Sequence, residues 1–209
     1  MYIPAANRVD ELQTLHALMQ EYNFATLITT DHGRPFATHL PFMLDTTRGA
    51  YGTLIGHMAR ANPQWQHFSS TSEVLTIFQG PHAYISPAWY TRPDAVPTWN
   101  YAVVHAYGTP QLVDQEADLY KMLTSLVNLH ESDKQPPRSI AWSDSQHKLL
   151  KAIVGFEIPI THLEGKFKLS QNRSLEDQTS VSEALRYSSH SDAQLIAQLM
   201  QDNIDRATK

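Results

Sequence analysis

Residues 56–65, Gly-His-Met-Ala-Arg-Ala-Asn-Pro-Gln-Trp, combine side chains that could bind an anion. An apolar, strand-like run over residues 51–55 leads into them, and Asn62 and Pro63 suit the N-cap and the first position of a helix. The free N–H groups of a helix start, together with the guanidinium of Arg60, would suit a phosphate. An N-capped helix after a strand is usually only a connection, however, so this segment alone does not establish a phosphate site.

Cations, amides, hydroxyls and an aromatic ring recur where other strands are expected to end or turn. These residues are Thr38, His39, His57, Arg60, Trp99, Asn100, Lys166, Lys168, Gln171, Asn172 and Arg173. A flat heterocycle needs a stacking face and hydrogen-bonding groups at its edge, while its phosphate needs Arg or Lys. If the residues converge, they describe a site for flavin mononucleotide (FMN). Taken singly, Trp99 could instead belong to the core, and Lys166 and Lys168 alternate as on a solvated strand face.

Other chemistries have weaker support. The chain has 11 histidines and no cysteine, which removes thiol catalysis and Cys-ligated metals and fits a reducing compartment. His39, His57, His82 and His105 fall on or beside expected strands, but no pair has a recognised metal-ligand spacing, so we expect no metal site. Neither a nucleophile elbow nor a carboxylate pair for acid/base catalysis is evident.

The charge and the hydropathy pattern limit the classes of partner. A net charge of -5 without a Lys/Arg cluster argues against broad, sequence-independent DNA binding. The sequence has no dinucleotide fingerprint, phosphate-binding Gly-rich loop or His-Glu-x-x-His motif. Because the chain starts without an apolar leader and contains no run of 18 apolar residues, we expect a cytoplasmic protein without a membrane span.

Hydrophobic spacing predicts the elements that position these side chains. Helices are expected at residues 9–22, 116–129 and 143–151 and near the C-terminus at 195–204, and Ser174 with Asp177 resembles a capping box. Strands are expected at residues 24–30, 35–44, 51–57, 73–79, 82–86, 100–113, 153–162 and 166–170, with a hairpin turn at 31–34.

This order of elements predicts a mainly β (β-rich α+β) fold, an antiparallel barrel flanked by helices. One domain over residues 1–187 accounts for the pattern, followed by a helical tail over residues 188–209.

Several segments together resemble one known family. They are residues 1–4 (Met-Tyr-Ile-Pro), 35–44 with their Ala-Thr-His-Leu-Pro-Phe core, 56–65, 78–90, 96–101 and 164–173. In this order they resemble the PaiB-like FMN-binding negative transcriptional regulators, which have the flavin split-barrel fold of the pyridoxamine phosphate oxidase superfamily. The resemblance covers most of residues 1–187, and the tail after Ser188 has no counterpart in it. The chain departs from the family at Asn7, where an aromatic is usual, and in a shorter loop at residues 91–96.

The resemblance implies a homodimer with FMN at the subunit interface. Arg60 and Asn62 would lie beside the phosphate, and the flavin would be lined by Thr38, His39, Leu40, His57, Met58 and Ala59. The pocket would be completed, with the partner chain as one possible source, by Trp99, Asn100, Lys166, Lys168, Gln171, Asn172 and Arg173.

Three functions follow, in order of preference. The first is a flavin-binding regulatory protein, and the regulatory part of this function is implied by the family name alone. The family resemblance also makes DNA a possible partner, but the net charge of the chain does not support DNA binding. The second is an FMN-dependent oxidoreductase, since a bound flavin brings its own redox chemistry. The third is haem binding through one of the histidines, which the expected phosphate site disfavours.

Overall fold

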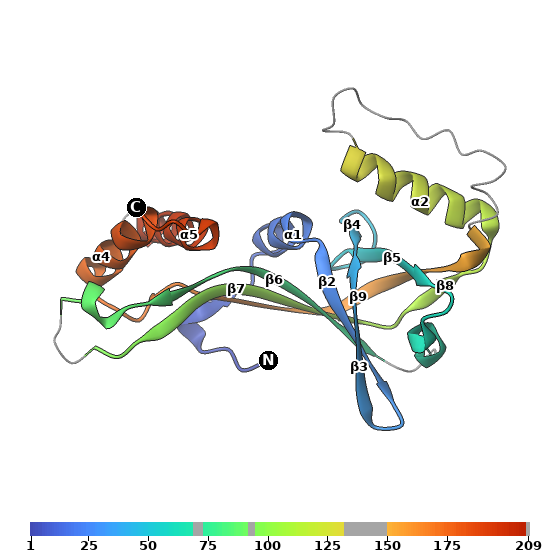
Figure 1. Ribbon diagram of the computed structural model, residues 1–209, viewed down its shortest axis with the longest axis horizontal. Coiled ribbons are helices and arrows are strands. Elements are labelled where there is room, and N and C mark those ends of the chain that lie inside the picture. The colour runs from blue at the N-terminus through green and yellow to red at the C-terminus, as the bar shows by residue number, and fades with distance from the viewer. Residues whose placement is uncertain (69–72, 92–94, 132–149, 208–209) are drawn as a thin grey trace. The chain divides into compact units, whose positions relative to one another are not determined.

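The computed structural model describes residues 1–68, 73–91, 95–131 and 150–207 (Figure 1). The contacts within the chain divide it into two compact units. Unit 1 contains Met1–Leu18, Gln79–Val104 and Glu164–Lys209, and unit 2 contains Met19–Phe78 and His105–Leu163. Three long strands, β6 (Val74–Ile85), β7 (Thr98–Gly108) and β9 (Ile153–Lys168), contribute residues to both units.

The strands form one sheet with the order β3-β2-β6-β7-β9-β5-β4, and β1 and β8 also pair with β9. The shorter strands are β1 (Arg8–Val9), β2 (Phe24–Asp31), β3 (Arg34–Pro41), β4 (Met43–Asp45), β5 (Thr53–Ala59) and β8 (Gln111–Val113). The pairs β2–β3, β2–β6, β4–β5 and β5–β9 are antiparallel. The expected mainly β, antiparallel fold with flanking helices is confirmed.

The hairpin between β2 and β3 confirms the turn expected at residues 31–34. Asp31 pairs with Arg34, so His32 and Gly33 form a two-residue loop. Their φ angles are 46° and 81°, and two positive φ angles in succession are typical of the type I′ turn that matches the twist of a hairpin. Glycine is suited to the second position because it adopts this conformation without a steric penalty.

Two pairs of expected strands are each one continuous strand. Residues 73–79 and 82–86 both belong to β6, and residues 153–162 and 166–170 fall on or just beyond β9. The separation at Pro81 was wrong because proline is tolerated where one strand edge is unpaired. The register of β6 with β2 covers residues 75–77, and Pro81 lies beyond it. Conversely, the long strand expected at residues 100–113 is divided into β7 and β8.

In unit 2, α2 (Glu116–Glu131) confirms the helix expected from residue 116 and covers a compact core. The buried members of this core are Ile55, Leu119, Met122, Leu123, Leu126 and Leu150. The helix expected at residues 143–151 falls mainly outside the described residues, and Leu150–Ala152 form a short 3-10 helix, η4. The loop at residues 91–96 is expected to be short, and its residues 92–94 also lie outside the described residues.

Two C-terminal helices pack against each other in unit 1. They are α4 (Leu175–Arg186) and α5 (Ser191–Ala207), with Val181, Leu185, Ile196 and Met200 buried. The hydroxyl of Ser182 donates to the carbonyl of Ala197 at 3.0 Å. The expected C-terminal helix is therefore confirmed, while the domain boundary after residue 187 stays a prediction. The helix at the other end of the chain, α1 (Leu12–Glu21), is also confirmed. Within the described ranges, no helix has the length and apolar character needed to cross a membrane.

Candidate functional site

The predicted site residues fall into two groups, one in each unit. The first, here called the loop group, lies in unit 2 and consists of Thr38, His39, Leu40, His57, Met58, Ala59, Arg60 and Asn62. The second, here called the lysine group, lies in unit 1 and consists of Trp99, Asn100, Lys166, Lys168, Gln171, Asn172 and Arg173. Each group has its own geometry and is described by itself.

Asn62 joins the segment after β5 to β3. Its Oδ1 accepts a hydrogen bond from the backbone N–H of Gln64 at 3.0 Å, which confirms the predicted N-cap. Its Nδ2 donates to Thr38 Oγ1, also at 3.0 Å, so Thr38 and Asn62 are brought together. The helix they precede, η2 (Pro63–His67), is a single five-residue 3-10 turn, so its dipole contributes less to anion binding than a longer helix would.

The guanidinium of Arg60 is partly engaged with the backbone. Its Nε donates to the carbonyl of Lys151 and its Nη2 to the carbonyl of Ile153, both at 2.9 Å. These bonds fix the direction of the exposed side chain. Among the described residues, no group accepts a hydrogen bond from Nη1, so it is available to an anion.

The other members of the loop group face different surroundings. His57 is half-buried, and its Nδ1 is buried without a hydrogen-bond partner among the described residues. Burial lowers the pKa of His57, so its ring is neutral at neutral pH. His39 is exposed and hydrogen-bonds with Thr26 on the neighbouring strand at 2.9 Å. Because successive residues of a strand face opposite sides, β3 does not bring His39 together with Thr38. Leu40 and Met58 are buried and Ala59 is exposed.

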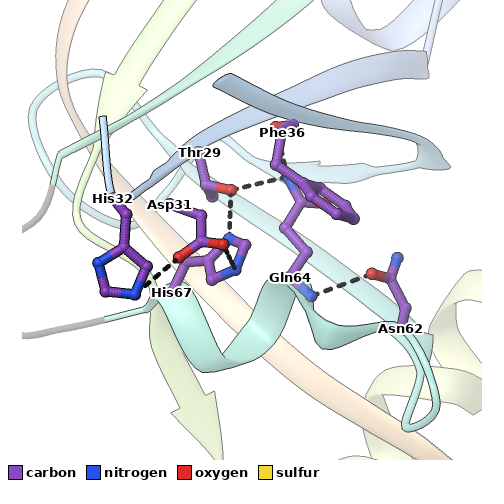
Figure 2. Close-up of polar contacts among 7 residues, drawn as sticks. All are labelled: Thr29, Asp31, His32, Phe36, Asn62, Gln64 and His67. Carbon is purple, nitrogen blue, oxygen red and sulfur yellow. Dashed lines mark hydrogen bonds and ion pairs between the residues drawn. The ribbon is translucent and has the colours of Figure 1, made fainter. Parts of the chain in front are cut away.

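A buried glutamine that sequence reasoning missed holds η2 against the β2–β3 hairpin (Figure 2). The side chain of Gln64 is fully buried, and its Nε2 donates to the carbonyls of Leu27 and Phe36 at 3.0 and 3.1 Å. It also lies 3.2 Å from Thr29 Oγ1, which hydrogen-bonds with His67 at 2.9 Å. No local signal distinguishes Gln64 from the exposed Gln66, because both partner strands are far away in the sequence.

The lysine group gathers three cations. Lys168 donates through Nζ to the hydroxyl of Thr98 and the carbonyl of Trp99, and Lys166 donates to the carbonyl of Tyr2 at 3.1 Å. Burial, with smaller contributions from the cations Lys166 and Arg173, lowers the pKa of Lys168. An anion bound here would relieve the repulsion between like charges.

The amides of this group are used to build the turn after β9. Asn100 is fully buried and donates to Ser170 Oγ at 3.0 Å. Gln171 accepts from the backbone N–H of Leu169 and donates to the carbonyl of Phe167. Asn172 is exposed, and the Arg173 guanidinium lies 4.9 Å from the centre of the Tyr90 ring. Asn100 and Gln171 therefore hold residues 167–170, the segment that carries Lys168.

The carboxylate of Asp177 is expected to stabilise the fold at neutral pH but not in acid. Its Oδ1 accepts from the N–H and the hydroxyl of Thr91, both at 2.9 Å, and these bonds are the main cause of its lowered pKa. A carboxyl group whose pKa is lower in the folded than in the unfolded state stabilises the fold at pH values above its ordinary pKa of 3.8. This stabilisation is lost as the pH falls through the folded-state pKa. We expect Asp177→Asn to unfold at a lower urea concentration than the wild type at pH 7. The difference should shrink on acidification below pH 3.8, and a constant difference would contradict the assignment.

Residues 1–162 match the family described as "Putative FMN-binding domain", and the chain belongs to this family. The PaiB-like resemblance and the prediction of FMN as the cofactor are confirmed at this level. The chain is 39% identical, over 99% of both chains, to "Protease synthase and sporulation protein PAI 2" of Bacillus subtilis (strain 168).

Solved structures agree with the fold. The FAD and heme binding protein from Mycobacterium smegmatis superposes with a TM-score of 0.60 at 14% identity, covering 78% of this chain and 73% of that one. The flavocytochrome Anf3 from Azotobacter vinelandii gives a TM-score of 0.59 at 16% identity, covering 77% of this chain and 68% of that one. At these identities the likeness establishes the fold alone, the mainly β, antiparallel fold with helices that the sequence predicts. Within the described residues the sheet runs from β3 to β4 and is not closed into a barrel.

Proposed function

We propose that this protein is a flavin-binding regulatory protein whose loop group holds the phosphate of FMN. The observation that carries the proposal is the Arg60 guanidinium, which is fixed by two carbonyls and whose Nη1 meets no acceptor in the ranges that the structure describes. Asn62, two residues after Arg60, is hydrogen-bonded to Thr38 at 3.0 Å, which supports these two residues as further members of the site. The Nδ1 of His57, buried without a hydrogen-bond partner among the described residues, fits a ligand that supplies one.

The lysine group is proposed to complete the flavin pocket from the partner subunit of a homodimer. Support comes from Lys166, Lys168 and Arg173, whose mutual repulsion an anionic ligand would offset. Asn100, Gln171 and Asn172 would shape this part of the flavin pocket. Trp99 would also belong to it, and its side chain lines another pocket of unit 1 as well. A cytoplasmic location belongs to the same proposal and is supported by the absence of cysteine from the sequence.

The regulatory part of the proposal is supported by the similarity to the Bacillus subtilis protein, whose name refers to protease synthesis and sporulation. A net charge of -5 favours indirect control over broad DNA binding. Direct repression would require a promoter fragment to migrate more slowly with the protein at physiological salt. An unshifted fragment at micromolar protein would favour indirect regulation.

An FMN-dependent oxidoreductase is the alternative function. The flavin would supply redox chemistry, and the neutral ring of His57 would offer hydrogen bonding without a competing positive charge. Reduction of the bound flavin by NADH or NADPH would favour this alternative. Haem binding ranks third, and a Soret band displaced by replacement of His39, His57, His82 or His105 would favour it.

The first test is an absorption spectrum of the purified protein with and without added FMN, combined with gel filtration. We expect a flavin spectrum that co-elutes with a dimer. A dimer that takes up no FMN would overturn the flavin proposal, and a monomer that binds FMN fully would overturn the shared pocket.

A further inference from the structure

One pocket is lined only by residues of unit 1, and none of the loop-group residues belongs to its lining. Its volume is about 570 Å³, and residues of β6, β7, the connection between α4 and α5, and the start of α5 contribute to its lining. Three of its lining side chains are the aromatic rings of Tyr84, Trp89 and Trp99, and a carboxylate is supplied by Asp192. Tyr84 and Trp99 are 47% and 52% exposed, which is high for residues of this size and leaves part of each one accessible to a ligand.

The rings of Tyr84 and Trp99 meet nearly at a right angle. Their centres are 5.9 Å apart and their planes differ by 73°, so they form two walls of different orientation. The ring of His82 lies 6.0 Å from Trp99, and its Nδ1 lies 3.3 Å from Oδ2 of Asp192. This contact holds the carboxylate beside the aromatic walls, and the side chain of Asp192 is still 43% exposed.

The charges in the lining determine which ligand fits. Aromatic faces carry a negative electrostatic potential and attract cations, and the carboxylate of Asp192 adds a negative charge. The lining contains neither Lys nor Arg, so a phosphate or carboxylate ligand would meet no permanent positive charge. A neutral aromatic ligand could stack on the rings but would make no use of the negative charge of Asp192, whose contact is with His82.

From this combination we infer that the pocket binds a small organic cation carrying an alkylated or quaternary ammonium group. The aromatic walls would contact the alkyl groups, and Asp192 would balance the charge. Both this site and the proposed FMN site include Trp99, so the two proposals compete for its ring. A test of cation binding must therefore include FMN as a competitor.

The experiment compares choline with 3,3-dimethylbutan-1-ol, a neutral molecule of nearly the same shape, by calorimetric titration of the full-length protein. We expect saturable binding of choline and at least about tenfold weaker binding of the neutral analogue, the scale of a partly desolvated cation–π contact. Asp192→Asn and Trp99→Leu should each weaken choline binding by a similar factor. Asp202→Asn, the same change on α5 but outside the lining, is the matched control and should bind choline as the wild type does.

Three results would overturn the inference. They are equal affinity for choline and its neutral analogue, no measurable choline binding by the wild type, and full displacement of choline by FMN. Full displacement by FMN would assign the pocket to the flavin. An absence of choline binding would also be the result if another copy of the chain covered the pocket. Far-ultraviolet circular dichroism of each variant separates loss of the site from loss of the fold.

Discussion

An Arg60→Ala variant is expected to bind FMN with an affinity lowered by about 1.5–3 kcal/mol, the range for a hydrogen bond to a charged group. This corresponds to a Kd roughly tenfold to a hundredfold higher. The wild-type guanidinium is held in place by the carbonyls of Lys151 and Ile153, so Nη1, which has no partner in the described part of the chain, is already oriented before the ligand binds. Quenching of FMN fluorescence on titration with protein measures the Kd directly.

Two companion variants define what the Arg60 result means. Arg48→Ala removes another exposed arginine of unit 2, one whose partner is Glu157, and should leave FMN affinity unchanged. Arg60→Lys keeps the charge but lacks the planar fork that bonds two carbonyls, so it should restore only part of the affinity. If Arg60→Ala binds FMN as tightly as Arg48→Ala does, Arg60 is a structural link and the phosphate lies elsewhere.

A Gln64→Leu variant is expected to lower the free energy of unfolding by about 2–3 kcal/mol. The change removes the hydrogen bonds that Nε2 donates to the Leu27 and Phe36 carbonyls, and each such bond contributes about 0.5–1.5 kcal/mol. The urea midpoint should fall while the slope of the transition stays the same. FMN affinity should also fall, because Gln64 fixes the turn that carries Asn62.

Gln66→Leu is the matched control for this variant, because Gln66 is exposed on the same short helix. It should change the urea midpoint little. If both variants unfold at the same urea concentration, the Gln64 network does not stabilise the fold. If Gln64→Leu is destabilised but binds FMN as the wild type does, the network supports the fold without positioning the ligand.

Local signals in the sequence determined many of the elements. The positive-φ turn at His32 and Gly33 and the caps at Asn62 and Ser174 each depend on residues within four positions of one another. Such short-range preferences hold in most surroundings, and so do the amphipathic helices. The ordered segments that resemble the PaiB-like proteins also identified the family and its cofactor.

Only the tertiary structure decided how the candidate site residues are used. Arg60 is linked to carbonyls 91 and 93 residues away, and Gln64 to carbonyls 37 and 28 residues away. The continuity of β6 through Pro81 likewise depends on which neighbouring strand extends beside it. Sequence patterns record the preference of a residue for an element, but strand pairing between distant segments sets its partners. For this protein the sequence determined the elements and the family, and the fold decided which polar groups remain free for a ligand.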